Sequence, residues 1–289
     1  YLRKKIERVY SDEARTGIFE EDNPFLEMIS DDLLETSVAV ANRWKEEFVV
    51  SENQKTNDLV FIQFSKEGVD HFAFLRIALR ETLTHLGGEV DNPIKLTQNN
   101  LPGFGTGADE ALVINLQSRK YHLIEKRIKY NGTFLNYFSE NLLQAQPKIS
   151  PKKSIKALEK TAQKIAESFN TDDFQFQSKV KSAIFNHIEE ENKLSPEKLA
   201  DDLFNDNLTA RLSFIDQVKE AVPEPVTFEE IDASRQLKKF ENQKLSLSNG
   251  IELIVPNNVY EDAESVEFIL NENGTYSILI KNIEDIQSK

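Results

Sequence analysis

The sequence predicts an α+β fold: an N-terminal mixed or antiparallel sheet with helices, a central helical region and a small C-terminal β-rich module. Short apolar runs bounded by turn residues predict strands between residues 58 and 128. Apolar residues three or four positions apart then predict helices up to residue 221, and two hairpin patterns follow. We therefore expect an N-terminal α+β domain at 1–146, a helical region at 147–222 and a β-rich module at 223–289.

The N-terminal domain is predicted to centre on an antiparallel sheet. Apolar side chains in residues 1–50 recur mostly at helical spacing. Asp58–Phe64 and Val69–Leu79 are β-rich runs joined by turn residues, and they predict a hairpin. Ala111–Leu116 and Tyr121–Ile128 are two further extended runs, which we expect to add strands to the same sheet.

The helical region is predicted to contain a lysine-rich helix that begins at Pro151, and three further helices. These three are Phe174–Glu190, Pro196–Phe204 and Leu208–Ala221. Thr227 and Glu230 then form a capping-box pattern, which predicts a short helix through Leu237. The C-terminal module is predicted to hold two hairpins. Their strands are Lys244–Leu247 with Ile251–Val255, and Val266–Leu270 with Tyr276–Ile280.

Charge is distributed unevenly along the chain. The net charge is −14, yet the segment from Arg119 to Lys164 holds eleven Lys or Arg residues and three acids, a net of +8. A cationic segment within an acidic protein indicates a surface for a polyanion, because unbiased surface decoration would spread both signs evenly.

The lysine-rich helix is amphipathic. At about 100° per residue, its lysines fall within an arc of about 120°, and its apolar residues lie on the opposite face. The lysines are Lys152, Lys153, Lys156, Lys160 and Lys164, and the apolar residues are Ile155, Leu158, Ala162 and Ile165. A lysine face is by default a solvated helix surface. The cations that precede this helix favour a phosphate-binding surface instead.

We predict that ten cations contact phosphate. They are Arg119, Lys120, Lys126, Arg127, Lys129, Lys148, Lys152, Lys153, Lys156 and Lys160. Tyr121, Tyr130 and Tyr137 lie among the first six, where they either stack on a ligand or pack within the domain. Each phosphate that a cation neutralises releases counterions, so binding should weaken with salt at a slope of about −0.9 per phosphate. The prediction requires the extended basic run and the lysine face to lie side by side as one basic strip.

Composition excludes several classes of protein. The chain has no Cys, which excludes a disulfide framework, a thiolate nucleophile and Cys-ligated metal sites and fits a reducing cytoplasm. No apolar run reaches the roughly 18 to 20 residues that span a bilayer, and the N-terminus does not resemble a signal sequence, so we expect no membrane association. Because the chain starts at Tyr1 inside a charged helical pattern, we expect a natural segment to precede it.

No combination of residues predicts an enzyme, a cofactor or a metal site. The glycine cluster Gly103–Gly107 lacks the preceding strand and following helix of a phosphate-binding loop, so we interpret it as a flexible loop. None of the four His has zinc-site spacing. We interpret His71 as a hydrogen-bonded structural residue and His187 as part of a solvated helix end. Three acidic pairs near predicted helix starts are interpreted as caps rather than catalytic acids. They are Asp31-Asp32, Asp172-Asp173 and Asp201-Asp202.

Several segments carry a likeness to a known family. They are Arg235-Gln236-Leu237-Lys238-Lys239-Phe240, Gly250-Ile251-Glu252-Leu253, Val266-Glu267-Phe268 and Thr275-Tyr276-Ser277-Ile278, with a weaker likeness over Tyr130–Leu143 and the lysine-rich helix. In these segments and in the order of its elements, the chain resembles bacterial nucleoid-associated proteins of the NdpA or YejK type. The resemblance covers nearly the whole chain. It implies a cytoplasmic, non-enzymatic protein of the nucleoid that binds double-stranded DNA and organises the chromosome.

We therefore expect a protein that binds duplex DNA with little sequence preference, because phosphate contacts carry no base information. The alternative is an acidic protein-interaction factor that docks partners at the nucleoid, with nucleoid proteins bound by the lysine face. A third reading, a hydrolase, lacks a nucleophile–base pair in the sequence. A homodimer would double the cationic surface, and the sequence leaves the choice between monomer and dimer open.

Overall fold

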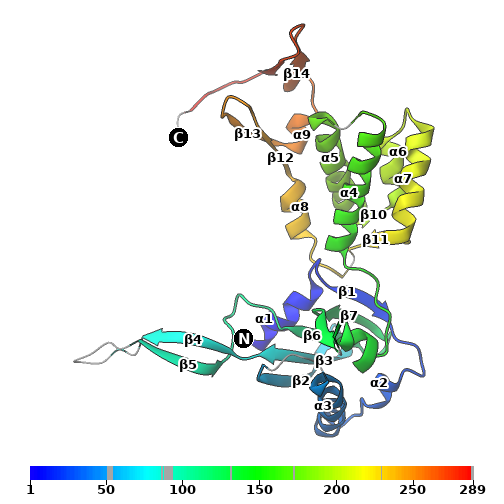
Figure 1. Cartoon of the computed structure of the whole chain (residues 1–289), viewed down its shortest axis with the longest axis vertical. Coiled ribbons are helices and arrows are strands. Elements are labelled where there is room, and N and C mark those ends of the chain that lie inside the picture. The colour runs from blue at the N-terminus through cyan, green and yellow to red at the C-terminus, as the bar shows by residue number, and fades with distance from the viewer. Residues whose placement is uncertain are drawn as a thin grey trace. The chain divides into compact units, whose positions relative to one another are not determined.

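The computed structural model describes residues 1–50, 55–85, 87, 94–130, 132–171, 173–228 and 230–287. The chain forms two compact units, Tyr1–Pro151 and Lys152–Lys289 (Figure 1). Both helices and antiparallel sheets are present, so the predicted α+β class is confirmed. The separation of a helical region from a β-rich module at residue 223 stays a prediction.

The N-terminal unit is built on a five-stranded antiparallel sheet in the order β1-β7-β6-β3-β2. Its strands are β1 (Arg15–Ile18), β2 (Asn57–Lys66), β3 (Val69–Ala78), β6 (Glu110–Asn115) and β7 (Lys120–Ile124). The predicted hairpin is confirmed as β2–β3, with Lys66 opposite Val69. Glu67 and Gly68 both have positive φ at its two-residue turn, as a turn that matches the strand twist requires.

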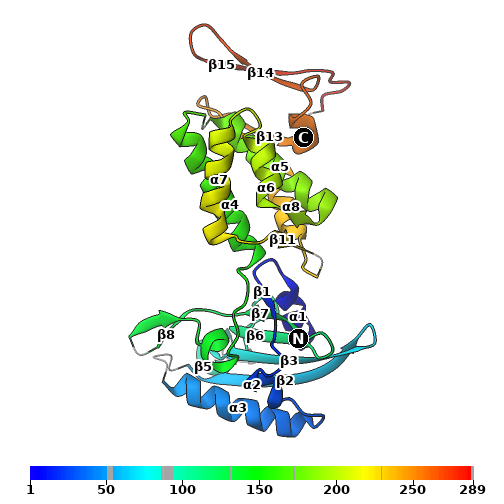
Figure 2. The ribbon, with the colours of Figure 1, turned by 90° about the vertical axis from the view of Figure 1, so that its right-hand side faces the viewer.

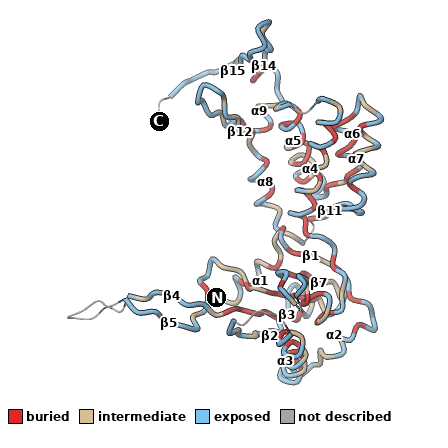
Figure 3. The backbone as a smooth tube through the Cα atoms, in the orientation of Figure 1, coloured by how far each residue is buried: buried red, intermediate tan, exposed pale blue. Residues whose placement is uncertain are grey.

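Helices cover both faces of this sheet. Phe72 and Phe74 of β3 point to the face that α3 (Leu33–Val49) covers, whereas Ala73 and Leu75 point to the opposite face, where Val9 of η1 (Arg8–Tyr10) packs. Because both faces are buried, β3 is buried from His71 to Ala78, as Figure 3 shows for the centre of the sheet. The helical elements of this unit are α1 (Leu2–Glu7), η1 (Arg8–Tyr10), α2 (Pro24–Glu27), α3 (Leu33–Val49) and the π-helical turn η2 (Phe138–Leu142).

The segment 1–50 is mostly helical, as expected, and it also contributes the edge strand β1, whose Arg15 pairs with Leu123 of β7. One prediction for the N-terminal unit was wrong. The run predicted as one strand to Ile128 ends at Ile124, because Glu125 turns inward to accept hydrogen bonds from Arg15 and Ser139. The chain resumes as a separate hairpin, β8 (Ile128–Tyr130) with β9 (Thr133–Leu135). A further exposed hairpin consists of β4 (Arg80–His85) and β5 (Ile94–Asn100).

The C-terminal unit begins with four helices that share one hydrophobic core (Figure 2). They are α4 (Pro151–Ser168), α5 (Phe174–Glu191), α6 (Pro196–Leu203) and α7 (Leu208–Ala221). Leu158, Ile184, Leu199 and Phe214, one from each helix, are fully buried in this core. All four predicted helices are confirmed, and the predicted ends of α5, α6 and α7 differ from the observed ends by at most one residue.

The remainder of this unit consists of short elements. They are β10 (Lys193–Leu194), β11 (Val226–Thr227), α8 (Ser234–Phe240), β12 (Asn242–Ser246), β13 (Glu252–Pro256), α9 (Asn257–Tyr260), β14 (Val266–Leu270) and β15 (Tyr276–Ile280). Both predicted C-terminal hairpins are confirmed as β12–β13 and β14–β15. The predicted capping box was wrong: Thr227 is an extended residue paired with Lys193, so helix α8 starts seven residues later, at Ser234.

Candidate nucleic-acid interface

Helix α4 carries an exposed lysine face. Pro151 occupies its first turn, where the missing N–H of proline has no helical partner to lose. Ile155, Leu158 and Ala162 are buried in the helical core and set the rotation of the helix. The opposite face carries five exposed lysines over an axial rise of about 18 Å. They are Lys152, Lys153, Lys156, Lys160 and Lys164.

Neighbouring helices border this lysine face on both sides. On one side, Glu159 of α4 forms an ion pair with Lys239 of α8, with 3.1 Å between Nζ and Oε2. On the other side, Lys164 donates a hydrogen bond of 3.0 Å to the amide oxygen of Gln217 on α7. At about 100° per residue, Glu159 and Lys164 lie just outside the arc of the other lysines. The lysines between them therefore point to solvent.

The charges at the centre of the face are uncompensated. No described residue forms an ion pair with Lys153, Lys156 or Lys160. Glu159, the acid nearest to them in the helix, is already neutralised by Lys239. Glu167 lies at the C-terminal end of the same face and accepts a hydrogen bond from Gln163. The face is therefore cationic over its first three turns and ends at a carboxylate.

Helix α8 adds cations that the sequence-based site prediction missed. Arg235, Lys238 and Lys239 are exposed, and the ion pair with Glu159 places the last of them beside α4. A signal was present in the sequence, since three cations fall within five residues. Nothing local to that segment shows, however, which helix it packs against.

The predicted cations of the N-terminal unit do not form one cluster. Arg119 and Lys120 lie at the start of β7, whereas Lys126, Arg127 and Lys129 follow its end. The strand between them, Lys120–Ile124, separates the two groups by about 13 Å. Arg119, with a positive φ of 60° in the β6–β7 turn, forms an ion pair of 3.0 Å with Glu21.

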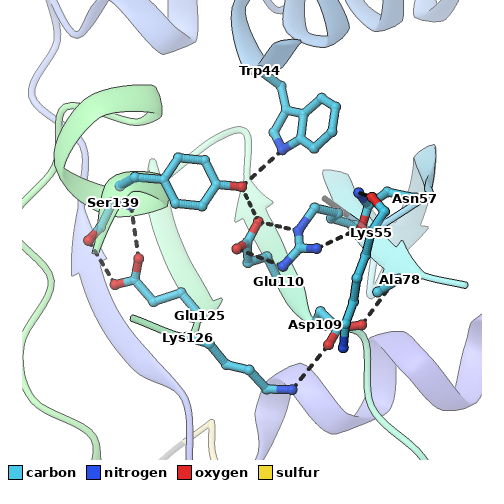
Figure 4. Close-up of polar contacts among 11 residues, drawn as sticks. Trp44, Lys55, Asn57, Ala78, Asp109, Glu110, Glu125, Lys126 and Ser139 are labelled. Carbon is cyan, nitrogen blue, oxygen red and sulfur yellow. Dashed lines mark hydrogen bonds and ion pairs between the residues drawn. The ribbon is translucent and has the colours of Figure 1, made fainter. Parts of the chain in front are cut away.

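The group beyond the end of β7 is also partly compensated. Lys126 forms an ion pair of 3.1 Å with Asp109, whose other oxygen accepts the Ala78 N–H (Figure 4). Burial of Asp109 opposes ionisation, but the Ala78 N–H and the Lys126 ammonium outweigh it and lower the pKa of this carboxyl. Arg127 donates to the carbonyl of Phe134 at 2.6 Å, a neutral partner that leaves its charge in place.

The last two predicted contacts of this unit are exposed lysines. Lys129 lies in the β8–β9 hairpin, opposite Phe134. The backbone of Lys148 is fixed to β1, because its N–H donates a hydrogen bond of 2.8 Å to the carbonyl of Thr16. The single basic strip that would join these cations to the lysine face of α4 stays a prediction.

The tyrosines of the basic run serve the interior. Tyr121 and Tyr137 are buried, with 1% and 0% of their surface exposed, so neither offers a ring for stacking on a ligand. Tyr130 is partly buried and donates a hydrogen bond of 3.1 Å to Glu47 on α3. Of the two readings that the sequence left open, packing within the domain is the correct one for Tyr121 and Tyr137.

A buried polar network, which the sequence did not reveal, holds the sheet of the N-terminal unit to α3 and η2 (Figure 4). Arg76 of β3 donates two hydrogen bonds to Glu110 of β6, at 2.6 and 2.9 Å. Tyr137 donates to the same carboxylate and accepts from the indole of Trp44 at 3.0 Å. Burial and the adjacent Glu110 raise the pKa of Tyr137, so its hydroxyl stays protonated. Arg76 and Glu110 are 2% and 0% exposed, which suits a structural role rather than contact with a substrate.

The other candidate sites also have structural roles. The ammonium of Lys5 donates to the carbonyls of Gly103 and Thr106, so the glycine loop directs carbonyl oxygens inward rather than the N–H groups that a phosphate needs. His71 forms the expected structural hydrogen bond, 2.9 Å from Nδ1 to the Val69 carbonyl. His187 lies 2.7 Å from Asp202. Within the described parts of the chain, no group of three His, Asp or Glu side chains could hold a metal ion.

The acidic pairs divide between two roles. Asp32 and Asp173 cap the N-termini of α3 and α5, as predicted. The prediction was wrong for Asp201 and Asp202, because α6 is capped by Ser195 and these two residues therefore fall in its last turn. Asp201 forms an ion pair of 2.9 Å with Arg211. Asp172 lies outside the described residues.

A comparison with known protein families matched residues 1–286 to the family described as nucleoid-associated protein YejK. The chain belongs to the nucleoid-associated protein YejK family. The match extends over almost all of the 289 residues, so the resemblance inferred from the sequence is confirmed. A comparison with curated proteins found no match.

Membership of the YejK family gives the protein a role at the nucleoid and places it in the cytoplasm, where the nucleoid lies. Nucleoid-associated proteins of this family are generally not enzymes. In the part of the chain that the structure describes, no helix combines the length and the apolar character needed to cross a bilayer.

Proposed function

We propose that the protein binds double-stranded DNA with little sequence preference and that the lysine face of α4 is its main contact surface. The observation that carries the proposal is the set of uncompensated ammonium groups on Lys153, Lys156 and Lys160 in a protein of net charge −14. A nucleoid role supports DNA as the polyanion. Phosphate contacts of this kind position a protein on a duplex without reading bases.

The other cations have secondary parts in this proposal. Arg235 and Lys238 of α8 extend the surface beside α4. The six predicted cations of the N-terminal unit, from Arg119 to Lys148, add further phosphate contacts. Arg119 and Lys126 must exchange their acidic partners for phosphate, so we expect each to contribute less than an unpaired lysine of α4.

The test is DNA binding by the full chain over a series of salt concentrations. Replacing Lys153, Lys156 and Lys160 with Ala should weaken binding and make the slope of log K against log salt shallower by about 2.7, at about 0.9 per phosphate contact. A matched control replaces Lys193, Lys198 and Lys219, which lie elsewhere in the same unit, with Ala. It changes the net charge equally and should leave the slope near the wild-type value.

Two results would overturn the proposal. One is equal loss of DNA affinity in the α4 variant and the control, which would mean that only net charge matters. The other is no salt-dependent binding by the wild-type protein, combined with nuclease-resistant capture of nucleoid proteins that the α4 variant loses. That second result would favour the alternative in which the lysine face docks an acidic protein partner.

A further inference from the structure

The C-terminal unit has an open groove that is separate from the lysine face of α4. It has a volume of about 870 Å³ and is formed by the first turns of α5 and by the β12–β13 and β14–β15 hairpins. Apolar side chains from all three elements line it, including Phe174, Leu253 and Ile278. Figure 1 shows β12 and β13 beside α9 and the end of α5, and β14 beyond the helices.

The walls of the groove are fixed to the helical core. The buried amide of Gln243 on β12 donates to the carbonyl of Ser178 on α5 at 3.1 Å and to Asn257 at 2.8 Å. The ring of Phe174 lies 5.2 Å from the rings of both Phe268 and Tyr276, centroid to centroid, and so holds the second hairpin. The groove is therefore a built feature of the unit and not a gap between loose strands.

The groove leaves apolar surface in contact with water. Ile251, Tyr276 and Ile280 line it and are 50%, 52% and 48% exposed. Both hairpins are two-stranded sheets, a form that is marginally stable in water unless another element covers it. Contiguous exposed apolar surface of this kind marks an interaction site.

The charge of the groove selects among occupants. Its charged lining residues are Lys181 and Lys244, and none of the acidic residues that the structure describes lines it. No described residue forms an ion pair with either lysine. In a chain with 49 acidic and 35 basic residues, two unpaired ammonium groups above an apolar floor fit an occupant that carries both apolar and acidic side chains.

The chain itself carries such a segment two residues after β15. It is Ile283-Glu284-Asp285-Ile286, in which the two isoleucines are 52% and 82% exposed. The two residues before it are tied down: Lys281 donates to the carbonyl of Ala263 at 3.1 Å, and Asn282 donates to that of Glu264 at 3.0 Å. Beyond them the tail extends away from β14 and β15 (Figure 1).

We infer that the groove binds the C-terminal tail of a second copy of this chain. Every copy carries both a groove and a tail, so two copies can exchange tails about a two-fold axis and cover both grooves at once. The isoleucines fill the apolar floor, and the carboxylates of Glu284 and Asp285 approach Lys181 and Lys244. The protein is then a homodimer whose contact lies in residues 174–287, away from the lysine face.

The experiment measures the mass of the full chain in solution by sedimentation. One chain has a mass of 33.1 kDa, and the wild-type protein should have twice that mass. Replacing Ile283 and Ile286 with Asp should raise the dissociation constant of the dimer by at least tenfold. The matched control is Ile254→Asp, an exposed residue of β13 that does not line the groove, and it should remain dimeric.

A charge-swap pair distinguishes exchange between copies from binding of the tail within one copy. One variant reverses the groove (Lys181→Glu with Lys244→Glu) and the other reverses the tail (Glu284→Lys with Asp285→Lys). Each alone should be monomeric, and an equal mixture should form a heterodimer in which both grooves meet tails of opposite charge. The substituted side chains are exposed or half-exposed, and circular dichroism checks that both variants fold.

Three outcomes would overturn the inference. The first is a monomeric wild-type protein at high concentration. The second is a dimer that survives both the isoleucine substitutions and the charge reversals. The third is a mixture of the two charge-reversed variants that remains monomeric.

Discussion

Removing the charge of Glu110 should destabilise the N-terminal unit strongly. In Glu110→Gln, the guanidinium of Arg76 loses the carboxylate that accepts two of its hydrogen bonds. It retains the hydrogen bond of 2.7 Å to the side-chain oxygen of Asn57 and the cation–π contact with the ring of Phe48. Arg76 is 2% exposed and cannot reach water. Breaking a buried ion pair by removing one partner costs about 3–5 kcal/mol, because the remaining charge is buried without compensation. We expect the free energy of unfolding to fall by that amount.

The assay is urea unfolding followed by tryptophan fluorescence. Trp44 is the single tryptophan of the chain, and its indole donates a hydrogen bond to Tyr137 within the same network. Its signal therefore reports on the N-terminal unit, which matters because a chain of two compact units need not unfold in one step. Glu159→Gln is the control: it breaks an ion pair of the other unit whose side chains are 26% and 53% exposed, and it should move the Trp44 transition by less than about 1 kcal/mol.

A loss of less than about 1 kcal/mol in the stability that Trp44 reports for Glu110→Gln, which is the cost of an exposed pair, would contradict this prediction. So would a shift of the same transition in Glu159→Gln that is as large as the shift in Glu110→Gln. Either result would mean that the buried network does not hold β3, β6 and η2 together.

Three further predictions use the same fluorescence signal. The pKa of Asp109 is lowered below 3.8 in the folded state. The contribution of this carboxylate to stability is therefore present above about pH 4 and is lost as the pH falls through the folded pKa. Asp109→Asn should be less stable than the wild-type protein at pH 6, and its free energy of unfolding should change less with pH below pH 4. Gly17→Ala places a methyl group against the buried ring of Tyr121 and should cost about 1–3 kcal/mol, so a wild-type stability would contradict the packing of β1. Asp32→Ala removes the side-chain oxygen that accepts the Leu34 N–H at 2.8 Å and should cost about 1 kcal/mol, whereas Asp31→Ala, beside the cap, should cost less.

Elements whose pattern is local could be predicted from the sequence. The predicted ends of α7 at Leu208 and Ala221 and the strands of β14–β15 match the structure residue for residue. Helix α4 was predicted with its lysine face outward, because 3.6-residue periodicity places its apolar side chains on one side. In each case, periodicity, turn residues and caps within a few positions contain the necessary information.

Elements that depend on partners far along the chain could not be predicted. Strand β1 is four residues long, and it is a strand because Arg15 pairs with Leu123, more than one hundred positions away. Thr227 has the sequence pattern of a cap, but pairing with Lys193 makes it extended. The same limit applies to the buried Arg76–Glu110 pair, whose members come from neighbouring strands 34 positions apart.

The candidate interface shows the same division. The sequence by itself determined the family, the absence of thiol chemistry and the cationic face of α4, because composition and helical periodicity need no knowledge of distant contacts. Only the tertiary structure decided which cations are neutralised, as Arg119 is by Glu21, and that Lys239 of α8 borders α4. Ion pairs and helix packing depend on which side chains the fold brings within a few ångströms, and separation along the chain does not determine that distance.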